Sequence, residues 1–178
     1  MSVITTLLDR NRDFASTGAH EKVPSIPFHP RRGLYVVTCI DPRVDPSLFL
    51  ELEMGEAIVA RDVGGRVTPQ VLQDLEYISY LVETKTPAGP WFEVAIIHHT
   101  DCGSALLADP VLRHAFAMRT GADGAQLART AVTDPDATVR FDVGLVTSDP
   151  NISSNVRVSG HVYDVATGLL RMIVDPGA

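Results

Sequence analysis

The chain has 178 residues and a mass of 19.2 kDa, which suits one domain with a sizeable core. Its apolar content of 45% and charged content of 21% are ordinary for a globular protein. The net charge of −7 and the pI near 5.2 argue against general binding to nucleic acids or anionic membranes, because both would repel the chain on average.

The N-terminal residues 1–14 do not resemble a signal peptide, since acidic and basic residues interrupt them before a long apolar region develops. No window approaches the roughly 18 uninterrupted apolar residues that a membrane span needs. We therefore expect a cytoplasmic protein that binds neither membranes nor nucleic acids. In that compartment the two cysteines, Cys39 and Cys102, are more often reduced thiols or metal ligands than a disulfide.

The first half of the chain alternates between helical and strand patterns. Residues 18–32 are rich in Pro, His, Lys and Arg and are predicted to form a loop. The apolar runs 33–40 and 56–63 predict two buried strands, with one or two helical turns within 47–54. Residues 2–17 are predicted to form an amphipathic helix because apolar side chains recur on one side, at Ile4, Leu7, Leu8 and Phe14.

Thr68 and Pro69 form a strong helix start, with Thr68 as the N-cap and Pro69 at the first helical position. The predicted helix runs over 69–84. A third strand is expected over 91–98, followed by helical stretches over 105–108 and 110–119.

The last part of the chain is expected to contain one more helical stretch from about Gly124 and three more strands. The run 139–147 is predicted to be the fourth strand, after a turn at 134–136. Two strand-like runs, 156–163 and 169–174, are joined by a hairpin-like turn.

These patterns predict an α/β fold in a single domain over 1–178. Its centre is a mostly parallel sheet of about four parallel strands plus a C-terminal strand, flanked by helices. The chain places Cys39 at the carboxyl end of the first strand and His99 at that of the third. Ligands collect at such ends in open α/β sheets, where the strand order reverses.

Cys39, His99 and Cys102 are the candidate metal ligands. Two thiolates and one imidazole form a soft, tetrahedral ligand set that suits zinc. Three protein ligands leave a fourth position open, which is typical of a catalytic rather than a structural metal. The alternatives are a pair of buried apolar thiols and a redox pair, but neither of them needs His99.

Asp41 and Arg43 follow Cys39 in the order Cys-Ile-Asp-Pro-Arg. A guanidinium can hold a carboxylate through two hydrogen bonds, which fixes its orientation and lowers its pKa. The ionised Asp41 could accept the proton of a zinc-bound hydroxide, or it could move onto the metal as the fourth ligand. Both possibilities stay open, and a purely structural ion pair at the strand end is the simpler alternative.

Three neighbouring features are interpreted more simply. His98 precedes a ligand within a strand, so it should face the other side of the sheet as a packed or hydrogen-bonded core histidine. Asp101 is expected to cap the loop by accepting hydrogen bonds from nearby backbone amides. Gly64 and Gly65 lack the G-x-G-x-x-G frame of a dinucleotide site.

The chain resembles the beta-class carbonic anhydrases in four segments. They are Cys39-Ile-Asp41-Pro-Arg43, the run from Gly55 to Gly65, His98-His99-Thr-Asp-Cys102-Gly103, and the run from Gly160 to Leu169. The two motifs C-x-D-x-R and H-x-x-C are specific only when they occur together. One departure is Arg61-Asp62, where many members have Arg-Asn.

The resemblance implies one Zn²⁺ per chain, bound by Cys39, His99 and Cys102, with Asp41 and Arg43 as the catalytic dyad. It implies a central parallel sheet and a homodimer or homotetramer. In such an assembly an arm formed by residues 1–32 would pack on a partner subunit. The substrate pocket is expected beside Gly64, Gly65 and Gly103.

The implied activity is hydration of carbon dioxide to bicarbonate by zinc-bound hydroxide, which zinc makes available near neutral pH. The family also contains hydrolases of carbonyl sulfide and carbon disulfide with the same zinc site, so these substrates are the first alternative. A non-catalytic zinc-binding or assembly protein is an alternative of another class.

Overall fold

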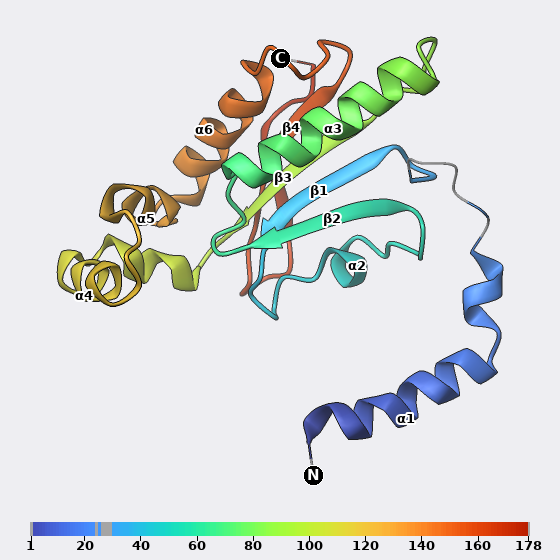
Figure 1. Cartoon of the computed structure of the whole chain (residues 1–178), viewed down its shortest axis with the longest axis horizontal. Helices are drawn as coiled ribbons and strands as arrows, with labels where there is room; N and C mark the ends of the chain where they lie inside the picture. Colours follow the sequence, from blue (N-terminus) through green and yellow to red (C-terminus); the bar gives the residue numbers. More distant parts are fainter. Residues whose placement is uncertain (1, 24, 26–29, 178) are drawn as a thin grey trace.

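The computed structural model describes residues 2–23, 25 and 30–177, and it shows a five-stranded sheet in the order β2-β1-β3-β4-β5 (Figure 1). β2, β1, β3 and β4 run parallel, and β5 pairs with β4 in the antiparallel sense. The predicted α/β class and the mostly parallel sheet are confirmed. The strands are β1 (Leu34–Cys39), β2 (Ala57–Asp62), β3 (Glu93–His99), β4 (Arg157–Tyr163) and β5 (Leu170–Val174).

Several of the helices begin at strong start signals. Thr68 and Asp109 cap two of them with their side chains, and a proline occupies the next position in each. The predicted loop over 18–32 contains a short 3₁₀ helix, and its residues 24 and 26–29 lie outside the described part of the chain. The helices are α1 (Val3–Ser16), η1 (Ala19–Lys22), α2 (Pro46–Phe49), α3 (Pro69–Lys85), η2 (Gly103–Ala108), α4 (Pro110–Thr120), α5 (Gly124–Thr130) and α6 (Pro135–Thr147).

The predicted fourth strand over 139–147 is wrong, because these residues form most of α6. Asp134 is not part of a simple turn. Its side chain caps the helix and Pro135 occupies the first turn, which together make a helix start. The buried residues of α6 follow helical spacing, at Val139, Asp142, Val143 and Val146. The fourth parallel strand is β4, which the sequence indicated only as a strand-like run near the end.

The chain order reverses between β1 and β3. From β1 the chain runs to the edge strand β2, then returns past β1 through α3 to reach β3 on the other side. In open α/β sheets this reversal leaves a crevice at the carboxyl ends of the two strands. Cys39 ends β1 and His99 ends β3, so both expected ligands lie at this point.

Both faces of the sheet are buried at its central strands β1 and β3. On one face lie α3 and α6 (Figure 1). Their residues Leu75 and Val143 belong to one buried apolar cluster with Val37 and Ile96. On the other face Thr38 and Ile97 are completely inaccessible to solvent. There the ring of Phe49, from α2, stacks on Tyr163 with 4.4 Å between ring centroids.

A buried polar network joins α6 to the sheet behind the carboxyl ends. Asp142 accepts two hydrogen bonds from the Arg66 guanidinium, at 2.7 and 2.8 Å, and one from the Val67 amide at 3.1 Å. His98 lies 3.2 Å from Asp142 through Nε2 and 2.8 Å from the Thr138 hydroxyl through Nδ1. His98 is fully buried on this face, which confirms its expected place as a hydrogen-bonded core histidine.

The amphipathic helix α1 stands apart from the sheet in Figure 1 and contains no buried residue. Its apolar stripe is open to solvent, with Leu7 41% and Leu8 48% exposed. Within residues 2–23, 25 and 30–177, no helix has both the length and the apolar character needed to cross a bilayer.

Replacing Asp142 with Ala should lower the free energy of unfolding by about 3–5 kcal/mol, because Arg66 would keep a buried charge without its partner. Asp136→Ala is the control on the same helix, since Asp136 pairs with Arg171 at the surface. Its loss should stay below about 1 kcal/mol. Urea unfolding of both variants measures the difference, and equal losses would contradict the importance of the buried pair.

Candidate metal centre

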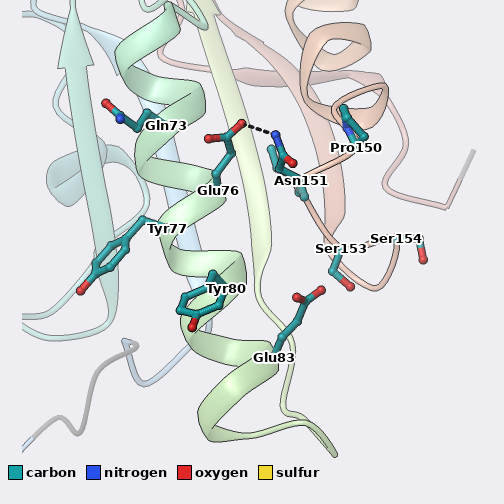
Figure 2. A pocket seen from close by; sticks show the side chains of 10 residues that line it. Gln73, Glu76, Tyr77, Tyr80, Glu83, Pro150, Asn151, Ser153 and Ser154 are labelled. Carbon is teal, nitrogen blue, oxygen red and sulfur yellow. Dashed lines mark hydrogen bonds between the residues drawn. The ribbon is translucent and has the colours of Figure 1, made fainter.

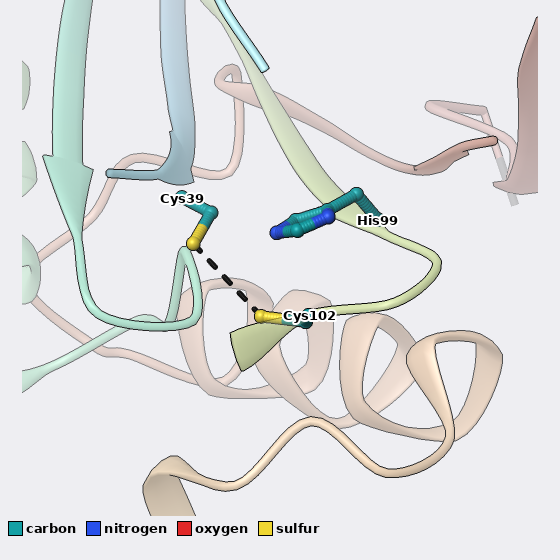
Figure 3. A group of neighbouring side chains, drawn as sticks. All are labelled: Cys39, His99 and Cys102. Carbon is teal, nitrogen blue, oxygen red and sulfur yellow. Dashed lines mark hydrogen bonds between the residues drawn. The ribbon is translucent and has the colours of Figure 1, made fainter. Parts of the chain in front are cut away.

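Three side chains converge at the reversal point. The sulfurs of Cys39 and Cys102 and a ring nitrogen of His99 all lie within 4.8 Å of one another, and all three residues are buried. Figure 3 shows them pointing toward a common point from β1, from β3 and from the turn that follows β3. The two sulfurs are 3.9 Å apart. The sequence-predicted ligand set is therefore brought together, in a geometry that can hold one metal ion.

The ring of His99 is oriented for ligation. Its Nδ1 lies 2.9 Å from the carbonyl oxygen of Thr100, so Nδ1 carries the hydrogen and donates it. Its Nε2 is buried and has no hydrogen-bond partner in the described part of the chain. A neutral imidazole held by its other nitrogen is the usual arrangement of a histidine ligand. The orphaned Nε2 is thus the observation that fits a metal best.

The two cysteines have different acidities. The hydrogen bond with Cys102, and then burial, raises the pKa of Cys39 to about 11. The same hydrogen bond lowers the pKa of Cys102 to about 6, against the effect of burial. The contact between the two sulfurs therefore favours one thiolate, which the proton of the other thiol stabilises.

Ser104 supports Cys102 and was not singled out by the sequence analysis. Its hydroxyl lies 3.2 Å from the Cys102 sulfur and accepts a hydrogen bond from the Val132 amide at 3.1 Å. The hydroxyl hydrogen is then free to point at the sulfur, which favours the thiolate. Only proximity in the chain, two residues after a ligand, could have suggested this role.

Asp41 and Arg43 form the expected ion pair. Arg43 donates from Nε and Nη2 to the two carboxylate oxygens of Asp41, at 3.0 and 2.7 Å. The hydrogen bonds from Arg43 lower the pKa of Asp41 to about 2, so this carboxylate is ionised at neutral pH. Its charge acts on both His99 and Cys102.

Asp101 does not have the predicted role. Its carboxylate accepts a hydrogen bond from Nη1 of Arg43 at 2.7 Å, and its carbonyl oxygen accepts one from Nη2 at 3.0 Å. The expectation that Asp101 caps backbone amides is wrong, because Arg43 reaches across from the other strand end and takes the carboxylate instead.

Arg61 fixes the backbone around the first ligand. From β2 it donates to the carbonyl oxygens of Cys39 and Asp41, at 3.0 and 2.7 Å. In the sequence Arg61 stands out only as part of a segment that resembles the family. Its role follows from the pairing of β2 with β1, which a single motif does not reveal.

The glycines expected at a substrate pocket lie beside the ligands. Gly65 has a φ of 65°, and a Cβ there would come within 2.7 Å of the Cys39 backbone nitrogen, so only glycine fits. Gly64 is buried next to it, with a φ of 87°. Gly103 follows Cys102 and is exposed.

A surface hollow lies away from the cluster of Cys39, His99 and Cys102. It has a volume of about 860 Å³ and runs along the outer side of α3 (Figure 2). Tyr77 and Tyr80 line it, and Glu76 accepts a hydrogen bond from Asn151 at its edge. No candidate ligand is among its lining residues, so the hollow does not belong to the metal centre.

The fold and the centre together define an α/β protein with a soft three-ligand cluster at the reversal of its sheet. A family model described as carbonic anhydrase matches residues 34–120. Beta-carbonic anhydrase 1 of Mycobacterium tuberculosis is 31% identical over 175 residues, which cover 97% of this chain and 99% of that protein. The chain therefore belongs to the beta-carbonic anhydrase family, whose members are enzymes.

Two further relatives frame the comparison. A carbon disulfide hydrolase of an Acidianus species is 27% identical, over 94% of this chain and 87% of its own length. The crystal structure of a carbonic anhydrase from Streptococcus mutans superposes with a TM-score of 0.78 at 27% identity, covering 97% of this chain and 98% of that one.

Asp62 occupies the position where the sequence departs from the common Arg-Asn pair. One carboxylate oxygen accepts a hydrogen bond from the Arg66 amide at 2.7 Å. The other is buried and has no hydrogen-bond partner among residues 2–23, 25 and 30–177. Burial, together with the charge of Asp142, raises the pKa of Asp62 to about 6.

Asp62→Asn should therefore stabilise the protein at pH 8. The unfolded carboxyl titrates near 4 and the folded one near 6, so the wild type loses stability as the pH rises through this window. A neutral amide avoids that loss, which is on the order of 2 kcal/mol. Urea unfolding should show the gain at pH 8 and almost none at pH 4.

Asp123→Asn is the matched control for Asp62→Asn. Asp123 caps α5 at the surface, and asparagine caps equally well, so the free energy of unfolding should change by less than about 0.5 kcal/mol at either pH. A gain at Asp62 that does not depend on pH would contradict the assigned cause.

Proposed function

We propose that the chain is a zinc enzyme that hydrates carbon dioxide to bicarbonate. The observation that carries the proposal is the convergence of Cys39, His99 and Cys102, with Nε2 of His99 left for a metal. Two sulfurs and one imidazole nitrogen favour zinc over harder ions. The relative from Mycobacterium tuberculosis, a beta-carbonic anhydrase, supports the choice of reaction.

In this proposal Cys39, His99 and Cys102 hold the metal. When bound, zinc lowers the pKa of water and so makes a nucleophile available at neutral pH. Asp41 remains ionised, so its carboxylate can only accept hydrogen bonds. By accepting one from the attacking water or hydroxide, it orients that nucleophile toward carbon dioxide. Arg43 keeps the Asp41 carboxylate in place.

The substrate is small, and we place its pocket beside Gly64, Gly65 and Gly103. Gly65 keeps side-chain atoms away from the Cys39 backbone, and a Cβ on Gly64 would come within 3.0 Å of the Ser104 hydroxyl oxygen beside Cys102. A Cβ on Gly103 would have no atom within 4 Å, so there is open space next to Cys102. A linear three-atom molecule needs little more room than this.

Carbon disulfide is the second candidate substrate, because the relative from Acidianus is a carbon disulfide hydrolase. Carbonyl sulfide has the same linear shape and is included with it. The ligand set does not distinguish these substrates, so the distinction depends on the shape of the pocket and the access to it.

A side-by-side assay tests the proposed function. Purified protein should contain one zinc per chain by elemental analysis, lose turnover on chelation and regain it with zinc. Rates on carbon dioxide, carbonyl sulfide and carbon disulfide should rank carbon dioxide first. One zinc per chain with no turnover of any of the three would instead indicate a non-catalytic zinc-binding or assembly protein.

We further propose that residues 1–32 form an arm that packs on a second copy of the chain, giving a homodimer or homotetramer. The exposed apolar side chains of α1 support this, because a helix that buries nothing in its own domain needs a partner for its apolar side. The described part of the arm contains Leu7 and Leu8 at the centre of that side.

Asp41→Ala should lower kcat by at least about 100-fold while zinc stays at one per chain, because Asp41 orients water without being needed to hold the metal. Zinc content is measured by elemental analysis on the same sample as the rate. Turnover close to that of the wild type would show that Asp41 has no catalytic role.

Leu8→Glu should reduce the assembled species toward single chains, since it places a charge on the apolar side of α1. Thr6→Glu, which adds the same charge on the other side of α1, is the control. Light scattering after size-exclusion chromatography gives the mass of each variant. The proposed arm fails if Leu8→Glu keeps the wild-type mass, or if the wild type is itself a single chain.

A further inference from the structure

Arg43 joins the two strand ends that carry the metal ligands. Asp41 follows the ligand Cys39 on the β1 side, and Asp101 directly precedes the ligand Cys102 on the β3 side. The guanidinium donates two hydrogen bonds to the Asp41 carboxylate and two to Asp101, one to its carboxylate and one to its carbonyl oxygen. Its donors therefore face one aspartate on each side.

The contact between Arg43 and Asp41 cannot fix the catalytic geometry alone. The two residues are two positions apart on one loop, which Arg61 ties to β2, so their contact does not link this loop to the β3 side. The Arg43 side chain is 48% exposed, and an exposed pair with one carboxylate adds little rigidity. The link to Asp101 spans 58 positions and ties this loop to the turn that carries Cys102.

Asp101 adopts an unfavourable backbone conformation in the turn after β3. Its φ is 53°, a left-handed value that aspartate tolerates better than most residues. This conformation accompanies an orientation in which both the carboxylate and the carbonyl oxygen of Asp101 meet Arg43. Local strain of this kind often accompanies a functional constraint.

We propose that Asp101 is a positioning residue for the reaction: by holding Arg43 from the β3 side, it fixes the Asp41 carboxylate relative to the three metal ligands. The role rests on the proposed function for its effect on turnover. The Asp101–Arg43 link itself does not, and it can be measured separately. Asp101 acts through Arg43 and does not hold the metal.

Two substitutions separate the parts of this role. Asp101→Gly removes the carboxylate and tolerates the positive φ, so the backbone is not strained further. Asp101→Asn keeps an oxygen acceptor but removes the charge. Asp109→Asn is the control: Asp109 is an exposed helix cap, so it loses the same charge while its cap is kept.

In zinc-loaded protein, Asp101→Gly should lower kcat by about 10-fold to 100-fold through misplacement of Asp41. KM should change by less than about twofold. Asp101→Asn should lower kcat roughly 3-fold, because the neutral hydrogen bond is weaker than the charged one. Zinc should remain at one per chain in both, and Asp109→Asn should match the wild type.

A double-variant test identifies Arg43 as the intermediary. In an Arg43→Ala background, Asp101→Asn should change kcat by less than about twofold, since its effect has no other route. An equal loss of kcat with and without Arg43 would overturn the proposal. So would Asp101→Gly with the kcat of the wild type.

NMR of the Arg43 Nε–H group gives a readout that needs no turnover. The resonance is assigned by its disappearance in Arg43→Ala. Its hydrogen exchange with water should be slow in the wild type and at least about tenfold faster in Asp101→Gly. Unchanged exchange would overturn the proposal. If the wild type turned over none of the three substrates, the proposed function would fail, and this exchange measurement would still decide whether Asp101 holds Arg43.

Discussion

The parallel pairing of β1 with β3 is the constraint on which the candidate centre depends. The register sets Thr38 opposite Ile97, so the chain leaves both strands at the same level of the sheet. Cys39 and His99 therefore meet although they are distant in sequence. The reversal of strand order at this pair leaves no strand between them, and the turn after His99 brings Cys102 back to the same point.

At the carboxyl ends of the strands, the two faces of the sheet carry different groups. His98 and His99 are neighbours in one strand, and their side chains alternate between faces. His99 lies with the cysteines. Nε2 of His98 instead lies 3.2 Å from the Asp142 carboxylate in the buried network and donates to the Gly65 carbonyl oxygen, 3.1 Å away. Because Gly65 lies against Cys39, the network behind the sheet also shapes the ligand side.

The candidate ligands could be predicted from the sequence, but the residues that hold them in place could not. The convergence of Cys39, His99 and Cys102 could be predicted because a metal site restricts residue type and spacing. Helix α3 could be predicted because Thr68 and Pro69 mark its start. The strand predicted over 139–147 failed because its β-branched residues outweighed the cap at Asp134. Asp101, Arg61 and Ser104 act through contacts across the sheet, which depend on register and leave no local pattern.

Four aspartates around the centre differ in how their surroundings affect the charge of the carboxyl group. Asp41 and Asp101 share one exposed guanidinium, so Asp41 stays charged and available to a polar ligand. Asp142 is buried but lies against Arg66, and the hydrogen bonds it accepts lower its pKa. Asp62 is partly buried, and within the described part of the chain no cation pairs with its carboxylate, so its pKa rises to about 6. A nearby cation thus favours the ionised carboxylate, whereas burial without a cation disfavours it. The carboxylate that the proposed reaction needs ionised, Asp41, thus keeps its charge through the guanidinium of Arg43.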